Sequence, residues 1–554
     1  MQYDLRTEPW IIAKTIDGRS KKIGIEEALV NAAGYLEYTA PTGVYYDTYA
    51  IYRLLVTIVM DIYRPKNQKA IARLFFRKGF PADEVRKYLN RYVWDLYDPE
   101  KPFLQYTGKI NQKAHPVSSL SPLFQTGNND LFHMRPPRIN CSGINEHPVT
   151  FKNMDYKEPE WWNPFTVAEA ACTLIRVQFA YGKYGGIQSA FSAINENGLS
   201  YPVMALPQGK TAFETLVFSM TTVDKDSKGI PMWARDHYEI TDDPLDNFVA
   251  TAFHPRIYIR LNEPEEDGLV YSTKYAVIKP PKEPEEGAAS DIWGKSPEAK
   301  LKAEAIREME PHMIGITGPS SKKHLSTDIT RRQWLDALDQ IDELAPTSSY
   351  IKREYGILSA VYSEDPDAED NMDRYRYIQK HILYGMTMQG QGSSYSQMRC
   401  ELKMRDPLID NLWMRNAVKK YIDRIRLCAD VLSAMVMKEY DKDRSFGATL
   451  LKNSLYRYYD KARRLFDRYL DNIQGCEVNG SFRFTGDMDP QFISWNTLMH
   501  KAVNDLAISS FNRIPPRKNN LVQRALIKKE YIKYKEEEDY AWMELPKKRS
   551  GRKA

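Results

Sequence analysis

The segment VKKYIDRIRLCADVLSAMV (residues 418–436) marks the point at which the character of the chain changes. Its apolar residues recur with the spacing 4-3-4-3-4, and they are Val418, Ile422, Ile425, Ala429, Leu432 and Val436. This spacing is typical of an α-helix that buries one narrow face against partner helices. The segment therefore predicts a helix that belongs to a bundle.

Three more apolar stripes follow toward the end of the chain, and they begin at residues 451, 492 and 518. Glycines and the pair Pro515-Pro516 separate the stripes, and strand patterns stop at about residue 400. We therefore expect a C-terminal four-helix bundle over residues 401–546. The basic residues 547–554 form a tail that we expect to be disordered.

Residues 1–400 mix strand and helix patterns, which predicts a mixed α/β N-terminal domain and an α+β fold class overall. PWIIAKTIDGRSKKIGIEEAL (residues 9–29) predicts two strands joined by an Asp-Gly turn and followed by a helix. YDTYAIYRLLVTIVMDIY (residues 46–63) is apolar on nearly all sides and predicts a buried helix. Further strands are expected at residues 257–261 and 270–279.

The composition excludes several classes of protein. The chain has 554 residues, too many for a single core, and its 42% of hydrophobic residues suits a folded protein. The five cysteines form no CxxC pair and the nine histidines show no ligand spacing, so we expect neither a metal nor a cofactor. Without an apolar run of bilayer length or a secretory signal, we expect a cytoplasmic protein with no membrane contact.

The net charge of +5 is concentrated at one end of the chain. The tail holds five cations and no acid, and they are Lys547, Lys548, Arg549, Arg552 and Lys553. Subtracting these five leaves the rest of the chain near neutral. Nucleic-acid binding would therefore depend on local basic patches.

No motif of an enzyme is complete. QGKTAFET (residues 208–215) is similar to a phosphate-binding loop, but Met204 stands where the first glycine is required. Thr211 is better explained as a helix N-cap. Because no catalytic triad or nuclease spacing is found either, we expect no catalytic residues and no enzymatic activity.

Two glycine-rich stretches suggest close approach to a ligand. GKYGG (residues 182–186) follows a helix pattern, and its lysine and tyrosine suit phosphate contact and stacking. A helix C-cap with a turn is the alternative. YGMTMQGQGSSYSQM (residues 384–398) sets Gln391 between Gly390 and Gly392, and we expect helical segments on both sides. A turn between two domains is the alternative there.

The order of these motifs resembles the CasA family, the large subunit of the type I-E CRISPR surveillance complex Cascade, which acts in antiviral defence. The resemblance covers nearly the whole chain and ends with the helical bundle. The segments that carry it are residues 9–29, WDLYDPEKPFLQ (94–105), TVAEAACTLIRVQFAYGKYGG (166–186), GKTAFETLVFSM (209–220) and YGMTMQGQGS (384–393).

The resemblance implies a function. A family member finds the protospacer-adjacent motif (PAM) of double-stranded target DNA through the minor groove and starts strand separation, after which the guide RNA reads the sequence as an R-loop forms. It helps to recruit a separate helicase–nuclease. The implied partners are the small and backbone subunits of Cascade, the 5′ end of the guide RNA and the target duplex.

The resemblance also implies site residues. Gln391 would be a wedge that enters the duplex beside the PAM, and Gly390 and Gly392 would leave room for it. The residues implied in DNA binding at the minor groove are Gly182, Lys183, Gly185, Gly186 and a lysine finger, for which Lys279 is the first choice and Lys274 the second. In the long loop of residues 111–165, Asn128, Asn129 and Phe132 would touch the guide RNA and the PAM region.

Two other functions stay open. The chain could be a purely structural, non-catalytic assembly subunit in which Gln391 lies in a turn. It could also be a nucleotide-dependent enzyme that processes nucleic acid through the segment QGKT. The bundle would dock on the small subunits and guide the displaced strand, although a solvated face is the plainer reading of its cations, which are Lys419, Lys420, Arg424, Arg426, Arg463 and Arg464.

Overall fold

The computed structural model describes two compact units, residues 1–403 and 408–541, each with gaps. The described residues are 1–108, 115–116, 165–180, 183–184, 187–188, 193–195, 198–200, 204–238, 244–254, 257–270, 272–277, 309–312, 349–365, 374–389, 394–403, 408, 411–440, 444–473, 484–516 and 521–541. The basic tail of residues 547–554 lies outside them.

The N-terminal unit begins with the small antiparallel sheet that the sequence predicts. Strands β1 (Ile11–Thr15) and β2 (Ser20–Ile23) form a hairpin, and helix α1 (Ile25–Val30) follows. Gly18 has a φ of 84° in the connecting turn, a conformation that a residue with a side chain rarely adopts. Strand β3 (Tyr35–Thr39) pairs with the other edge of β1.

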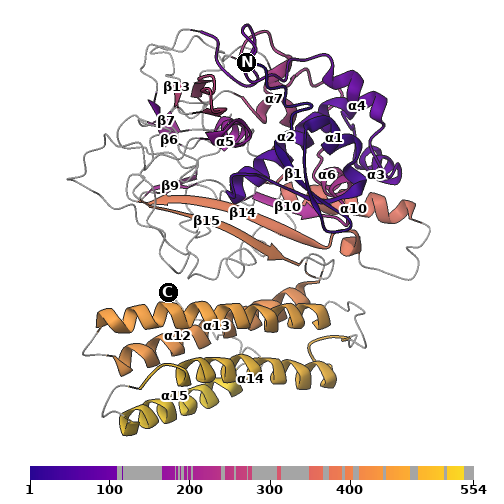
Figure 1. Ribbon diagram of the computed structural model, residues 1–554. Helices are drawn as coiled ribbons and strands as arrows, with labels where there is room; N and C mark the ends of the chain where they lie inside the picture. The colour runs from indigo at the N-terminus through magenta and orange to yellow at the C-terminus, as the bar shows by residue number, and fades with distance from the viewer. Residues whose placement is uncertain are drawn as a thin grey trace, which may run out of the picture. The chain divides into compact units, whose positions relative to one another are not determined.

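Helix α2 (Tyr45–Tyr63) is the central helix of this unit, and its residues are buried from Tyr46 to Met60, as the sequence predicts. Helices α4 (Ala82–Leu89), α5 (Val167–Ala180), α6 (Ala212–Phe218) and α7 (Phe248–Thr251) pack around it (Figure 1). Helix α10 (Ser349–Glu364) packs on α3 (Gln68–Phe76). Short 3₁₀ helices cover Ala32–Gly34, Met232–Ala234 and Arg374–Tyr377.

A five-stranded sheet corrects one expectation from the sequence. Strands β14 (Lys380–Gln389) and β15 (Ser394–Leu402) flank Gln391, so the prediction of helical segments on both sides is wrong (Figure 1). The opposite edge of β14 pairs first with β10 (Met204–Gln208) and then with β9 (Gly198–Ser200), which pairs with β8 (Ala193–Asn195). These pairings join distant segments, and a local helical pattern cannot reveal them.

Three smaller antiparallel sheets also occur among the described residues of this unit. Strands β11 (Ile257–Leu261) and β13 (Ser272–Val277) lie where the sequence predicts strands, and they pair with each other. Strand β13 also pairs with β4 (His115–Pro116). Strand β12 (Leu269–Val270) pairs with β5 (Phe165–Thr166). Strands β6 (Lys183–Tyr184) and β7 (Ile187–Gln188) form a short hairpin.

The described residues of the C-terminal unit form four helices, which confirms the predicted bundle. They are α12 (Leu412–Glu439), α13 (Arg444–Ile473), α14 (Pro490–Asn512) and α15 (Leu521–Ala541), and α12 contacts the other three. The whole apolar stripe from Val418 to Val436 is buried. Asp489 caps α14 by accepting hydrogen bonds from the backbone N–H groups of Gln491 and Phe492.

A polar seam inside the bundle corrects the assignment of one cation. Arg424 is buried, and its Nε donates to Oδ1 of Asn504 at 2.7 Å, so it does not belong to a surface that could follow phosphates. Tyr469 donates to Oδ1 of Asn496 at 2.9 Å in the same seam.

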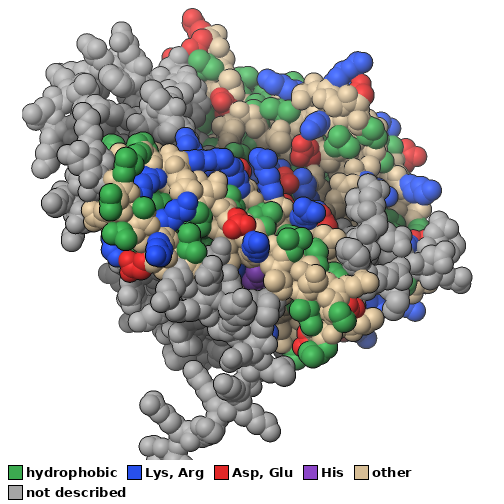
Figure 2. All heavy atoms as spheres, turned by 90° about the horizontal axis from the view of Figure 1, so that it is seen from below, with side chains coloured by type: hydrophobic (Ala, Val, Ile, Leu, Met, Phe, Trp, Pro, Cys, Tyr) green, Lys and Arg blue, Asp and Glu red, His purple; other side chains and the backbone are tan. Residues whose placement is uncertain are grey.

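Among the exposed cations, Arg464 lies 3.6 Å from Asp460. In the view from below, Figure 2 shows a band of lysine and arginine side chains with acidic side chains among them.

Candidate nucleic-acid interface

The β14–β15 hairpin places the predicted wedge at its end. The two strands pair without a break from His381 and Leu402 to Gln389 and Ser394. Residues 390–393, which connect this last pair, hold Gly390, Gln391 and Gly392 and lie outside the described residues. Because β14 is also paired along its opposite edge, with β10 and β9, the sheet holds the hairpin through β14.

Buried polar contacts fix the base of this hairpin to helix α10. His381 on β14 lies within 2.8 and 2.9 Å of the two carboxylate oxygens of Glu354 on α10, and both residues are buried. On β15, Glu401 accepts from Arg399 at 3.1 Å and lies 2.8 Å from the Nζ of Lys380. The contact between His381 and Glu354 is buried, where a hydrogen bond is costly to break, whereas Lys380, Arg399 and Glu401 are partly exposed. The contact with α10 is therefore the main support of the base outside the sheet.

The glycine stretch forms a second hairpin, the glycine hairpin (β6–β7). Lys183 pairs with Gln188 and Tyr184 with Ile187, which leaves Gly185 and Gly186 as the two connecting residues. Two-residue connections in hairpins favour glycine pairs, because they require positive φ angles. The hairpin begins three residues after α5 ends, and the alternative of a helix C-cap falls on residues 181–182, outside the described residues.

Helix α5 is anchored in the core by charge and by aromatic packing. Arg176 donates to the Asp47 carboxylate on α2, and both side chains are fully buried. Phe179 stacks on Tyr46 with ring centroids 5.5 Å apart and meets the edge of Tyr49 at 5.6 Å. The glycine hairpin thus extends from a helix that cannot shift without separating a buried ion pair.

Strand β9 links the glycine hairpin to the β14–β15 hairpin. After β7 the chain passes through β8 and β9, and Ser200 on β9 pairs with Thr387 on β14, two residues before that strand ends at Gln389. Tyr49 also contacts both supports, because its ring lies 5.9 Å from Tyr384 on β14. The glycine hairpin and the β14–β15 hairpin therefore belong to one connected part of the N-terminal unit.

The lysine strand β13 lies beside the ends of the long loop. Lys274 is opposite Arg260 in the β11–β13 pair. Residues 115–116 pair with 272–273, and residues 165–166 pair with 269–270, so both ends of the segment 117–164 are fixed next to this strand. That segment contains Asn128, Asn129 and Phe132.

The predicted residues divide into two groups. Lys183 and Lys274 lie in described strands. The others lie outside the described residues, and they are Asn128, Asn129, Phe132, Gly182, Gly185, Gly186, Lys279, Gly390, Gln391 and Gly392.

The family comparison decides what kind of protein has this arrangement. The family model described as CRISPR-associated protein Cse1 matches residues 4–502 of the chain. The chain belongs to the Cse1 family. This membership confirms the resemblance to the CasA family of large Cascade subunits.

Individual relatives agree with the family. The CRISPR-associated protein CasA/Cse1 of Thermus thermophilus is 28% identical over 239 residues, and this alignment spans 42% of this chain and 42% of that relative. The fold is similar to that of Cse1 from Acidimicrobium ferrooxidans, with a TM-score of 0.60 at 15% identity over 97% of this chain and 98% of the other. A chain of a CRISPR RNA-guided surveillance complex gives 0.56 at 15% identity over 96% and 99%.

In this Cse1-family chain, the carboxylate of Glu214 lies where a phosphate would bind in a complete phosphate-binding loop. Thr211 caps α6, as predicted, by accepting from the backbone N–H of Glu214 at 3.3 Å. Glu214 in turn accepts from the backbone N–H of Lys210 at 2.6 Å, and burial raises the pKa of this carboxyl. A phosphate would compete with Glu214 for this end of the helix, which argues against the nucleotide-dependent enzyme.

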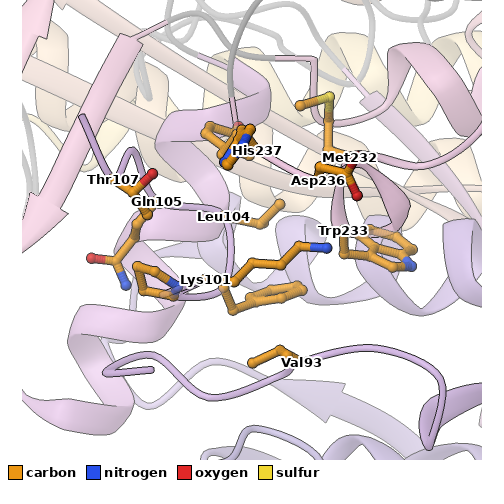
Figure 3. A pocket seen from close by; sticks show the side chains of 12 residues that line it. Val93, Lys101, Leu104, Gln105, Thr107, Met232, Trp233, Asp236 and His237 are labelled. Atoms are coloured by element: carbon orange, nitrogen blue, oxygen red, sulfur yellow. The ribbon is translucent and has the colours of Figure 1, made fainter. Parts of the chain in front are cut away.

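A cavity next to the segment 101–107 is too small for a nucleotide. It has a volume of about 10 Å³, which is room for about one water molecule, and Lys101, Met232, Trp233 and Asp236 contribute to its lining (Figure 3). Burial lowers the pKa of Lys101, although Asp236 acts in the opposite direction. Within the part of the chain that the structure describes, no cluster of His, Cys, Asp or Glu could hold a metal ion.

Sequence reasoning missed the residues that hold the interface in place. Asp47 and Arg176 are far apart in the chain, as are Glu354 and His381, so spacing gave no signal for either pair. The β14–β15 hairpin did leave a signal. Two runs of about ten residues flank a short glycine-rich connection, which is a pattern typical of a hairpin.

None of the described helices is both long and apolar enough to cross a bilayer.

Proposed function

We propose that this Cse1-family chain is the large subunit of a CRISPR RNA-guided surveillance complex, that it recognises the PAM of double-stranded DNA through the minor groove, and that it wedges the duplex open to start R-loop formation. The main support is the β14–β15 hairpin, whose end carries Gln391. No catalytic group enters this proposal, and the chain acts by binding alone. Recruitment of a separate helicase–nuclease belongs to the same proposal.

The wedge needs a rigid support. Opening one step of a duplex costs a few kcal/mol of stacking and pairing. A flexible loop would yield under that load, whereas β14 is paired along both edges and its base is bonded to α10 through His381 and Glu354. At the end of the hairpin, a glutamine amide can donate to and accept from exposed base edges, and Gly390 and Gly392 add no side chain that would collide with the bases.

The glycine hairpin suits contact with the minor groove. Its two connecting residues, Gly185 and Gly186, allow the backbone to approach the base edges closely. The pattern of donors and acceptors in the minor groove is degenerate, which suits the reading of a short and tolerant motif. Gly182 and Lys183 precede this connection, and Lys279 or Lys274 would reach the same groove as the lysine finger.

The remaining partners follow from the same arrangement. The loop with Asn128, Asn129 and Phe132, fixed at both ends beside β13, would contact the 5′ end of the guide RNA and the PAM region. The C-terminal bundle would dock on the small subunits, and the backbone subunits would be further partners in the same complex. The purely structural alternative assigns Gln391 to an ordinary turn, and it differs in a measurable way.

The test uses the reconstituted complex with a duplex that carries 2-aminopurine at the first base pair next to the motif. We expect Gln391→Ala to slow the rise of fluorescence by about tenfold or more, because the opened base pair loses the interaction with the glutamine amide that lowers the barrier to opening. Gln397→Ala, a glutamine of β15 away from the connection, is the matched control. Equal opening rates for the Gln391→Ala complex and the unaltered complex would favour the structural alternative.

Motif reading is tested separately by affinity for duplexes with and without the motif. We expect the unaltered complex to prefer the motif-bearing duplex at each of two salt concentrations, because phosphate contacts alone give affinity without selectivity. Equal affinity for both duplexes would contradict PAM recognition. Size-exclusion chromatography is the check that every variant still assembles.

A further inference from the structure

The motif WDLYDPEKPFLQ (residues 94–105) has no part in the proposed function. Its last residue, Gln105, nevertheless makes two side-chain hydrogen bonds to the backbone. Gln105 is buried, with 1% of its surface exposed. Its Oε1 accepts from the backbone N–H of Leu261 at 2.7 Å, and its Nε2 donates to the carbonyl of Leu96 at 2.7 Å. Both ends of the amide are therefore bonded to backbone in two different parts of the chain.

Gln105 and its neighbour cover one edge of strand β11. The backbone N–H of Tyr106 donates to the carbonyl of Ile259 at 3.0 Å, and Gln105 accepts from Leu261 next to it. The opposite edge of β11 pairs with β13, where Leu261 faces Thr273, the residue before Lys274. A side-chain amide thus takes the place of a paired strand, and it fixes the edge of the sheet that presents the lysine strand.

The residue before Gln105 reaches helix α5. Leu104 occupies a turn in which the N–H of Gln105 donates to the carbonyl of Pro102 at 3.1 Å. Its φ is 53°, a region that favours glycine or asparagine at this position of a turn. In this conformation the carbonyl of Leu104 accepts from Nε2 of Gln178 at 3.0 Å, and Gln178 is fully buried on α5. Such a backbone persists only where the surroundings hold it.

Two adjacent residues of the chain are therefore bonded to two different elements of the candidate interface. Leu104 is bonded to α5, from which the glycine hairpin extends, and Gln105 is bonded to β11, which pairs with the lysine strand. The small cavity beside residues 101–107 has room for about one water molecule, so it is too small for a nucleotide-sized ligand (Figure 3). We call residues 102–106 the clamp segment.

We propose that Gln105 is a positioning residue, and that the clamp segment sets the distance between the glycine hairpin and the lysine strand so that both reach one minor groove together. The inference rests on the proposed function for its ligand, which is a motif-bearing DNA duplex. Gln105 itself touches no DNA. It acts through Leu261 on one side and through the turn at Leu104 on the other.

The first experiment measures the clamp without DNA, by amide hydrogen exchange in the isolated chain. Gln105→Leu removes both side-chain bonds at similar volume, and Gln178→Leu loosens the clamp from α5. We expect Gln105→Leu to speed exchange in peptides that contain Leu261 by about tenfold or more, since a buried N–H loses its acceptor. The control is Val85→Ala, a cavity in α4, which packs on α1 and α2. Unchanged exchange at Leu261 would overturn the clamp.

The second experiment measures motif selectivity in the reconstituted complex. We expect each clamp variant to lower the ratio of affinities for motif-bearing and motif-free duplexes by about tenfold, with the motif-free affinity nearly unchanged because phosphate contacts remain. The double variant should lose no more than the sum of the single losses, because the two residues act through one segment. Val85→Ala should keep the full ratio.

The two readouts separate the possible failures. Faster exchange with an unchanged affinity ratio would show that Gln105 is merely structural and would overturn the positioning role. If the unaltered complex shows no selectivity at all, the proposed function fails and the positioning role fails with it. Faster exchange together with reduced selectivity supports both.

Discussion

The two hairpins of the candidate interface are held in place by different means. The β14–β15 hairpin is long, and strands β10 and β9 pair with the outer edge of β14 and hold the hairpin directly. The glycine hairpin pairs over only two residues in each strand, so its position depends on helix α5, which a buried ion pair fixes to α2. A long hairpin can be held in place by strand pairing, whereas the position of a short hairpin depends on the packing of the neighbouring helix against the core.

Tyr49 on α2 contacts both supports. Its ring lies 5.6 Å from Phe179 on α5 and 5.9 Å from Tyr384 on β14, and its hydroxyl is 2.9 Å from Nδ1 of His312. The other ring nitrogen of His312 lies 3.0 Å from the carbonyl of Ser219. A change at this point should therefore affect both hairpins, whereas changes at Asp47 or His381 should affect one.

The largest effect is expected from Asp47→Ala. This change removes the carboxylate beside the fully buried Arg176, and breaking a buried ion pair from one side costs about 3–5 kcal/mol of unfolding free energy. Exchange in peptides of α5 should become much faster than exchange in β14. Hydrogen exchange at several urea concentrations gives the free energy of each segment.

The double variant Asp47→Leu with Arg176→Met is the control for Asp47→Ala. Because it replaces both charges with apolar groups, it should recover most of the loss. A loss in β14 as large as that in α5 would contradict the separate support of the two hairpins.

A smaller effect, confined to the other hairpin, is expected from His381→Leu. The Glu354 carboxylate loses its hydrogen-bonded partner in a buried setting, which costs about 2 kcal/mol. Peptides of β14 should exchange faster, and those of α5 should not. Lys380→Ala, which removes a half-exposed ion pair on the next residue, should change little. Equal effects of the two substitutions would show that the contact with α10 is unimportant.

The smallest effect is a pH dependence shared by both hairpins. Burial, assisted by the charge of Arg53, lowers the pKa of His312 to about 3 from 6.5. The unfolded chain therefore binds more protons between these values, and stability falls as the pH drops below about 6.5, by at most about 1.4 kcal/mol per pH unit for this residue. Exchange in α5 and β14 peptides, corrected for intrinsic rates, should rise together between pH 6.5 and pH 5.

His312→Gln removes this titration and should flatten the common slope. A slope that persists in this variant would assign the effect to another group. His500 of the C-terminal bundle offers an internal comparison, because burial lowers its pKa to about 3 as well. Its titration should change exchange in α14 peptides and leave the hairpins unaffected.

The parts of the fold that local patterns determine could be predicted from the sequence. The stripe from Val418 to Val436 predicted a bundle helix, and the apolar segment 46–63 predicted the central helix, because helical periodicity needs no knowledge of distant residues. The flanks of Gln391 were mispredicted as helical, although two runs of about ten residues around a glycine-rich connection are typical of a hairpin, and β14 pairs with β15 from His381 to Gln389. Arg424 was assigned to the surface because its partner, Asn504, lies on another helix.

The candidate site divides in the same way. The glycine stretches and the cap at Thr211 are local features, and the sequence located them. The residues that position the site, such as Asp47, His381 and Gln105, bond to partners far away in the chain. Their roles depend on the tertiary structure, and no spacing in the sequence could indicate them.

The central claim is that residue 391 enters the duplex where the strands separate. The most direct measurement replaces Gln391 with a photoreactive benzoylphenylalanine in the reconstituted complex and maps crosslinks to a motif-bearing duplex. The same residue at Ile16, an exposed position in the β1–β2 turn, is the control. We predict crosslinks from position 391 at the first base pairs next to the motif and none from position 16. Crosslinks from position 391 only to distant DNA, or none at all, would contradict the account.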